Sequence, residues 1–202
     1  MTTAIGSYAT PRALRARLGL PDALDDGALA LVCDQVNGYI EHFCGRAICP
    51  VPEQAWLYDG TGTPELVVNN GIRAVAKLEL AYYTGGQYHT LLASDYFVRP
   101  AAGNRRPGWP GTLLVITNIP KSGFAVFPVG YDTVRLTATT GWDAIPDEVT
   151  DVALTAATRA WRSAQSGQAD VVGVDENGQA MVSRFFSARD LGTLRAYSLD
   201  LP

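Results

Sequence analysis

The sequence predicts an α+β fold in which a β-rich region interrupts a helical core. Apolar residues recur at helical spacing before residue 45 and again after residue 145. The region between them contains short strand-like runs separated by Gly, Pro and Asn, which is typical of an antiparallel sandwich or barrel-like unit. We therefore predict a small helical bundle formed by residues 1–50 and 143–202, with an antiparallel β-sandwich or barrel-like domain inserted at residues 51–142.

Two helices are expected at the N-terminal end. Thr10 and Pro11 predict an N-cap and a first helical position, and Gly19 ends this helix. A second helix begins at Asp25 or Asp26, because acidic residues favour a helix N-terminus. Its apolar face is Leu29, Val32, Val36, Tyr39, Ile40 and Phe43, and Gly45 is the expected stop.

Turn residues divide the middle of the chain into short strands. The turns are Asp59–Gly62, Asn69–Gly71, Gly85–Gly86 and Pro107–Gly111. The predicted strands are 56–58, 65–68, 72–80, 96–99, 113–117, 124–129 and 133–139.

The last third of the chain is predicted to be helical again. Ile145-Pro146-Asp147-Glu148 places Pro and two acids at a helix start. A hairpin-like segment is centred on residues 175–178. Ser187 and Asp190 form a capping-box pattern for a short final helix.

Composition argues against DNA gripping and membrane insertion. The 202 residues carry a formal charge of −4, whereas phosphate binding relies on clustered Lys and Arg. No apolar run approaches the ~20 residues of a membrane span. The first residues lack the basic start and apolar stretch of a signal peptide, so folding in a cytoplasm is expected.

No set of residues predicts catalysis, a metal or a cofactor. Cys33, Cys44 and Cys49 are expected to be reduced thiols, and His42 and His89 lie in different elements. Structural zinc usually needs four ligands with close Cys pairs, which this spacing does not provide. Asp22, Asp25 and Asp26 suit helix capping better than calcium binding, and Asp59–Thr63 suits a turn better than a phosphate loop.

Two surface features leave an alternative open. Arg105 and Arg106 form a basic spot in a loop that contacts solvent, DNA or a partner. Aromatic residues also gather in the β-rich region, so a carbohydrate-binding or other surface-binding module is the alternative function. They are Trp56, Tyr58, Tyr82, Tyr83, Tyr88 and Trp109.

Four segments in order resemble the long form, with a β-insertion, of the head–tail connector (head completion or adaptor) family of tailed bacteriophages. The opening residues 8–20 precede a helix that ends in Phe43-Cys44-Gly45-Arg46. The segment 56–66 is similar to the first hairpin of the insertion in long members. Residues 140–149 resemble the family's Gly-aromatic turn and Ile-Pro step, and residues 171–178 its loop before the terminal helix. The middle, 81–111, matches no pattern of the family.

The resemblance implies a structural protein and not an enzyme. Subunits would form a ring, twelve by analogy, under the portal vertex at the neck of the virion, after assembly in the host bacterial cytoplasm. The ring would extend the DNA channel and offer a platform for the head–tail stopper or tail terminator protein. Genomic DNA would pass through without specific binding, and an acidic lining would not trap phosphates.

The family analogy also implies that the C-terminal helix and tail, from about Ser187, bind the portal protein. The apolar residues there have no obvious cover elsewhere in the chain. An equally strong interpretation is that they close the chain's own helical bundle. The predicted portal-binding residues are Leu191, Leu194, Arg195, Tyr197, Leu199 and Leu201.

Overall fold

A computed structural model describes residues 7–21, 26–99, 108–117, 120–165, 171–174, 180–182 and 185–198. The described residues fall into two compact units. Those within Cys49–Ala144 form the β unit, and those within Gly6–Ile48 and Ile145–Pro202 form the helical unit. Among the described residues, no helix combines the length and the apolar character that crossing a membrane would require.

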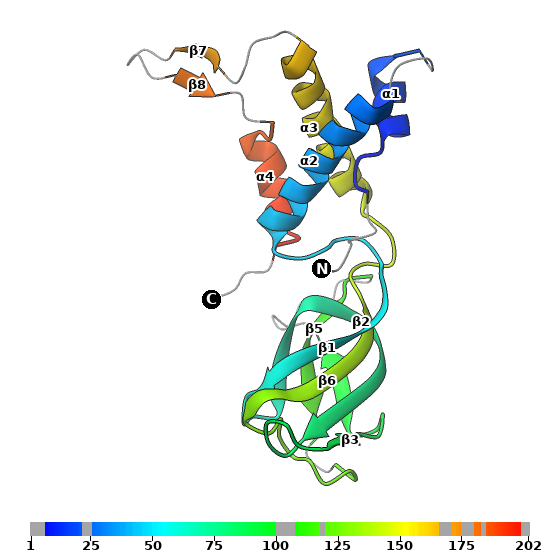
Figure 1. The fold of residues 1–202 in the computed structure, drawn as a ribbon, viewed down its shortest axis with the longest axis vertical. Helices are drawn as coiled ribbons and strands as arrows, with labels where there is room; N and C mark the ends of the chain where they lie inside the picture. Colours follow the sequence, from blue (N-terminus) through cyan, green and yellow to red (C-terminus); the bar gives the residue numbers. More distant parts are fainter. Residues whose placement is uncertain are drawn as a thin grey trace. The chain divides into compact units, whose positions relative to one another are not determined.

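The helical unit contains four helices that contact one another (Figure 1). Helix α2 packs on α3, and both of them contact α1 and α4. The helices are α1 (Pro11–Leu18), α2 (Asp26–Cys44), α3 (Asp147–Gln165) and α4 (Ala188–Arg195). A separate two-stranded antiparallel hairpin consists of β7 (Val171–Val174) and β8 (Ala180–Val182). Its predicted centre at 175–178 lies outside the described residues.

The helix boundaries follow the predicted signals. The Thr10 hydroxyl accepts the Ala13 N–H at 3.2 Å, Pro11 occupies the first turn, and Gly19 ends α1 with φ 65°. On α3 the buried face includes Ala153, Ala156 and other alanines, whose small size lets neighbouring helices approach closely. Together with Leu29, Val32, Val36 and Ile40 of α2, these residues form the interior of the helical unit.

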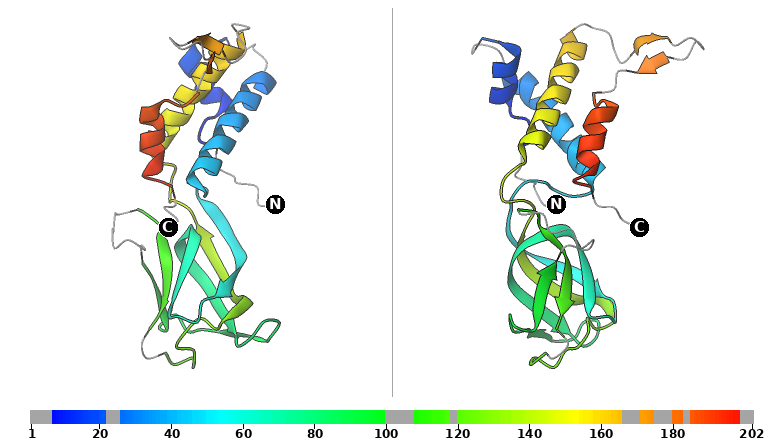
Figure 2. Two further views of the ribbon diagram at one scale, coloured as in Figure 1. Left: turned by 90° about the vertical axis from the view of Figure 1, so that its left-hand side faces the viewer. Right: turned by 180° about the vertical axis from the view of Figure 1, so that it is seen from behind.

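The β unit is one antiparallel sheet with the order β1-β6-β2-β5-β4, and β3 pairs with β2 (Figure 2). No pairing joins β1 to β4 among the described residues, so the sheet is not closed into a barrel. The antiparallel pairing expected for this sandwich or barrel-like unit is confirmed. The strands are β1 (Val51–Gly60), β2 (Glu65–Ala81), β3 (Tyr88–Thr90), β4 (Tyr96–Arg99), β5 (Gly111–Ile116) and β6 (Gly130–Thr140).

The predicted turn at Asn69–Gly71 is wrong, because β2 runs through it without a break. The strand changes partner there: residues 65–67 pair with β5, and residues 74–80 pair with β6. Gly71 has φ 70°, a conformation that residues with side chains rarely adopt. The glycine therefore bends one long strand and does not separate two short ones.

The predicted strand at 124–129 is also wrong, since these residues form loop structure before β6. Phe124 and Phe127 are nevertheless buried, at 4% and 0% exposure, beneath the end of the sheet. Apolar residues that fill a core from a loop give the same local pattern of hydrophobic residues in the sequence as a short strand. The short strand β3 was not predicted, because only three residues take part in its pairing.

The core of the β unit lies on the inner face of the bent sheet. Leu66 and Leu114 come from the β2–β5 part, whereas Leu78, Val134 and Leu136 come from the β2–β6 part. Since β2 belongs to both parts, its bend brings the two inner faces around one apolar interior.

Candidate interaction surface on helix α4

The start of α4 is held by a capping box and a cross-link to α3. The Ser187 hydroxyl accepts the Asp190 N–H at 3.2 Å, and the Asp190 carboxylate accepts the Ser187 N–H at 2.8 Å. The Arg159 guanidinium donates to Asp190 at 2.6 Å and to the Phe185 carbonyl at 3.1 Å. Burial raises the pKa of Asp190, but hydrogen bonds from Ser187 and Arg159 outweigh it and lower the pKa below its usual value.

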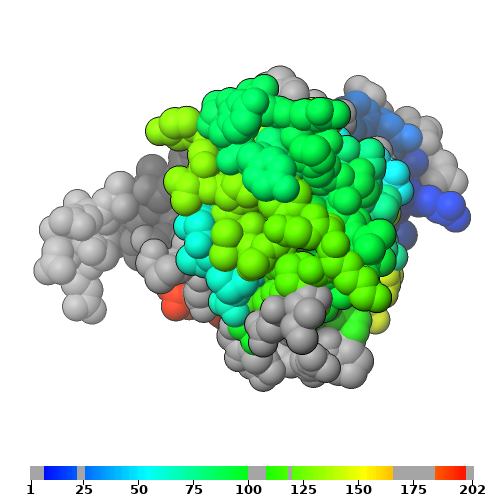
Figure 3. All heavy atoms as spheres, turned by 90° about the horizontal axis from the view of Figure 1, so that it is seen from below, coloured from blue at the N-terminus to red at the C-terminus, as the bar shows by residue number. Residues whose placement is uncertain are grey.

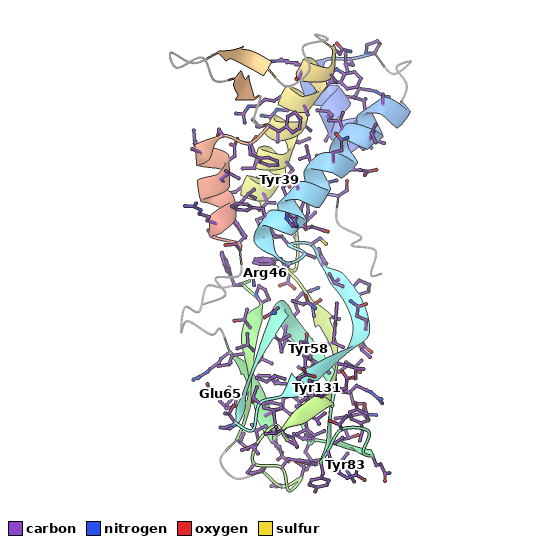
Figure 4. All side chains as sticks on the ribbon, turned by 60° about the vertical axis from the view of Figure 1, so that its left-hand side comes forward. Tyr39, Arg46, Tyr58, Glu65, Tyr83 and Tyr131 are labelled. Carbon is purple, nitrogen blue, oxygen red and sulfur yellow. The ribbon has the colours of Figure 1, made fainter. Side chains whose placement is uncertain are left out.

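The end of α4 is tied to both long helices. Arg46, which follows α2, donates from Nε to the Tyr197 carbonyl at 2.9 Å (Figure 4). The Tyr197 hydroxyl in turn donates to Glu148 in the first turn of α3 at 2.8 Å. Arg46 is 8% exposed, so this bond lies in the interior, where a hydrogen bond to a charged group is strong.

These contacts divide the predicted portal-binding residues into different classes. Leu194 is 0% exposed and Tyr197 is 6% exposed, so the helical unit itself covers them. Leu191 is half-buried and Arg195 is exposed. Leu199 and Leu201 lie outside the described residues. The expectation that nothing in the chain covers the apolar residues of the C-terminal helix is therefore wrong for Leu194 and Tyr197.

The solvent side of α4 is basic and built on small residues. Arg189 and Arg195 are exposed, and Gly192 has no neighbouring group near the position of a Cβ. Ala188 and Ala196 are exposed as well. A partner that binds α4 while it remains in this position would therefore meet arginines and small side chains, and not the buried leucine.

Sequence reasoning missed the polar residues that hold α4. Arg46, Glu148 and Arg159 are distant from α4 in sequence, and each looks like an ordinary surface charge. A weak signal did exist at Arg46, because the resemblance to the connector family includes this arginine at the end of its helix. The pairing itself depends on how α4 packs on α2 and α3.

The residues considered for chemistry are separated from one another. Cys33, Cys44 and Cys49 are buried, and burial raises the pKa of Cys33 and of Cys44 to about 11. Thiols of this kind remain protonated at neutral pH. His42 and His89 are exposed, one in each unit. Within the described part of the chain, no group of three or more His, Cys, Asp or Glu could hold a metal ion.

The other sequence candidates have structural partners where they are described. Asp26 pairs with Arg15 of α1, whereas Asp22, Asp25, Arg105 and Arg106 lie outside the described residues. In the turn 59–63, the Thr63 hydroxyl donates to the Glu65 carbonyl at 2.8 Å, and Gly62 N–H donates to the Phe127 carbonyl at 2.8 Å.

The aromatic residues of the β unit do not form one platform. Trp56 and Tyr58 are half-buried on the inner face of β1. Trp109 packs edge-on against Trp142, at 5.6 Å between ring centroids. The Arg135 guanidinium lies over the Tyr88 ring, 3.9 Å from its centroid. Only Tyr82 and Tyr83 of the predicted set are well exposed, at 59% and 67%.

The chain matches no protein-family model. No curated protein sequence matches it at a significant level. Its fold, however, is similar over its whole length to chains in solved structures of gene transfer agent (GTA) particles. A chain in the neck of an empty GTA particle, computed with C6 symmetry, has a TM-score of 0.59 at 14% identity, covering 100% of this chain and 95% of that one.

Two further structures give the same result. A chain in the neck of a native GTA particle, computed with C12 symmetry, has a TM-score of 0.54 at 14% identity, with 100% and 94% coverage. A chain in the virion of a native GTA particle has a TM-score of 0.52 at 15% identity, also with 100% and 94% coverage. The chain therefore shares the complete α+β fold of chains from these particles.

Proposed function

We propose that this protein is a structural component of the neck of a tailed-phage-like particle, and that it acts as a head-to-tail adaptor. The observation that carries the proposal is whole-chain similarity: both units, in the same order, match chains from GTA necks with nearly complete coverage of each. A local motif shared between unrelated proteins would not extend over 100% of the chain.

In this proposal the copies form a ring, twelve by family analogy, beneath the portal protein. The C6 and C12 symmetry of the similar necks supports a cyclic arrangement. The ring extends the DNA channel and provides the docking platform for a stopper or tail terminator protein. The net charge of −4 suits a passage through which DNA slides without being held. Assembly takes place in the host cytoplasm, and the role requires no catalysis or cofactor.

The portal contact is assigned to the exposed side of the C-terminal segment. Of the predicted portal-binding residues that the structure describes, Arg195 and half-buried Leu191 are available there without rearrangement of α4. Leu194 and Tyr197 support the contact indirectly, because they hold α4 in position.

The first test is electron microscopy of lysates from a phage with a nonsense mutation in this gene. The proposal expects DNA-filled or leaking heads beside complete, free tails. Normal tailed particles would contradict a joining role.

A matched pair of charge reversals tests the portal contact. Arg195 and Arg162 are both exposed and both lie in the last turn of a helix, so reversal costs a similar helix-dipole energy at each. We expect Arg195→Glu to reduce binding to purified heads lacking this protein, and Arg162→Glu to bind normally. Equal binding of both variants would remove Arg195 from the portal contact.

Carbohydrate binding remains the alternative function, and the exposed Tyr82 and Tyr83 favour it. Tyr82 stacks on Phe124 at 4.5 Å between ring centroids, so at most one face of its ring is open to a sugar. A module of this kind would leave head–tail joining intact in the nonsense mutant and impair adsorption to cells.

A further inference from the structure

The β unit exposes large apolar side chains on two neighbouring segments of the chain. Two segments, 82–92 and 124–131, contain no Asp, Glu, Lys or Arg. More than half of the large apolar residues exposed in the described chain lie on them. We call this surface the uncharged tip; its exposed apolar members are Tyr82, Tyr83, Leu92, Val126, Val129 and Tyr131.

Direct contacts show that the two segments form one surface. Tyr82 and His89 both contact the Phe124 ring, with centroid separations of 4.5 and 6.1 Å. The Tyr131 N–H donates to the Thr84 hydroxyl at 3.0 Å. Figure 3 shows the two segments side by side, in green and yellow-green, at this end of the unit.

The tip rests on a firm base. Leu91, Phe124 and Phe127 are buried beneath it, at 4%, 4% and 0% exposure. Asp95 lies beside the base and accepts the Ser122 N–H at 2.7 Å, so the loop before Phe124 is pinned to the turn before β4. Exposed side chains on a supported base can bind a partner with little ordering cost.

The outer face of the β1–β6 part of the sheet shows what an ordinary solvent face of this unit looks like. Half-buried Arg135, Thr137 and Thr139 alternate there on β6 with the buried residues Val134, Leu136 and Ala138. Alternation of this kind is usual where an antiparallel sheet faces water. The uncharged tip lacks this alternation of polar and apolar residues over two separate segments, which is more than one isolated exposed apolar residue would explain.

The chemistry of the tip selects among partners. Nucleic acid needs Lys or Arg to neutralise phosphates, and the two segments contain neither. A sugar stacks on one open ring face, and Tyr82 has at most one such face because the other is stacked on Phe124; the adsorption measurement in the test below separates a glycan ligand from a protein. Depletion of charge together with exposed tyrosines is typical of the centre of a protein–protein interface.

We propose that the uncharged tip is a second protein-binding surface of this chain, and that its occupant is an apolar, uncharged surface of a tail-side protein of the particle. This inference rests on the proposed neck function. Charge matching supports it, because the two segments offer no counter-charge of their own. The charged side chains beside them, Arg135 over the Tyr88 ring and Asp132 after Tyr131, lie outside the segments, so a charged partner group facing the exposed tyrosines would be desolvated without compensation. A joining protein needs two different contacts, and the basic face of α4 differs from the tip in both charge and composition.

The test is head–tail joining in vitro. Heads from the nonsense mutant are mixed with purified protein and then with purified tails of the same phage. Binding to heads is measured by co-sedimentation, and joined particles are counted by electron microscopy. Wild-type protein must first restore joining; if it does not, the neck function itself fails, before any statement about the tip is tested.

The variants are Tyr83→Asp and Tyr131→Asp, at residues that are 67% and 74% exposed. Tyr83→Ser and Tyr131→Ser remove the rings without adding charge, in case the aspartates disturb the fold. Leu57→Asp is the matched control, because Leu57 is 53% exposed on β1 and lies outside the tip. Circular dichroism checks that each variant folds.

We expect the tip variants to bind heads like wild type but to lower the number of joined particles about tenfold or more, as loss of an aromatic anchor does at other interfaces. Leu57→Asp should join tails normally. Normal joining by the tip variants would overturn the proposal. Loss of head binding would also overturn it, because the tip would then be a portal-side or copy–copy contact. Normal joining with impaired adsorption would overturn it too and would indicate a glycan ligand.

Discussion

The helical unit and the β unit present opposite kinds of surface. The exposed side of α4 carries Arg189 and Arg195 on small residues, whereas the tip of the β unit is aromatic and carries no charge. The two surfaces are also supported differently. Long-range hydrogen bonds to Arg46, Glu148 and Arg159 hold α4, and a buried apolar layer supports the tip.

The two surfaces are supported differently because the apolar area buried beneath them differs. A helix of 8 residues buries little apolar surface, so specific polar bonds must supplement its packing. A loop surface above a large apolar core needs fewer such bonds, because the core already fixes the chain on either side.

Leu194→Ala should have the largest effect on the helical unit. Leu194 is 0% exposed, and removing a buried leucine side chain costs about 2–5 kcal/mol of unfolding free energy. Leu191→Ala, at a half-buried neighbour, should cost about 1 kcal/mol or less. Urea unfolding followed by circular dichroism measures both. Equal costs would mean that α4 does not pack as described.

Gly141→Ala should destabilise the β unit strongly. Gly141 has φ 79°, and a Cβ there would overlap the Cys49 carbonyl oxygen. The strain of an alanine in the left-handed backbone conformation and the steric overlap together should lower the free energy of unfolding by about 2 kcal/mol or more. Gly85→Ala is the control, with φ 77° and open space around the Cβ, so that only the backbone strain remains. Thermal unfolding of the two variants separates the contributions, and similar melting temperatures would argue against the overlap.

Asp190→Ala should weaken the attachment of α4. The change removes the capping box and the acceptor of Arg159, with an expected loss of about 1–2 kcal/mol. Asp190→Asn keeps a capping oxygen and should recover part of it. Amide hydrogen exchange at residues 188–195 gives the readout. If exchange there stayed as slow as in wild type, the polar links would not be what holds the helix.

Asp95→Asn should produce a pH-dependent effect in the β unit. The Ser122 hydroxyl, with the backbone N–H groups of Lys121 and Ser122, lowers the pKa of Asp95 to about 2. A depressed carboxyl pKa stabilises the fold above the unfolded-state value of ~4, and that stability is lost as the pH falls towards 2. The denaturation midpoints of wild type and Asp95→Asn should therefore differ at pH 7 and converge between about pH 4 and pH 2. A constant difference across that window would contradict a role for the charged form.

Much of the fold could be predicted because its signals are local. The caps of α1 and α4, the acidic start of α3 and the spacing of the apolar residues in α2 depend on neighbours within a few residues. The strands at 96–99 and 133–139 were predicted for the same reason, since alternation and flanking turns lie within one short segment.

The errors arose where a residue's role depends on distant parts of the chain. Asn69–Gly71 resembles a turn, but the long strand β2 continues because β6 offers new hydrogen-bond partners beyond residue 71. Phe124–Val129 resembles a strand, but no strand in the described part of the chain pairs with it, and its phenylalanines fill the core from a loop.

The sequence by itself therefore determined the α+β class, the order of a helical, a β-rich and a second helical region, and the absence of charge in the two segments of the tip. Only the tertiary structure decided that these segments meet on one surface, that Leu194 and Tyr197 face inward, and that Arg46, Glu148 and Arg159 hold α4. The physical reason is range. Caps and periodicity act over one or two turns of chain, whereas burial and long-range hydrogen bonds exist only after distant segments have packed together.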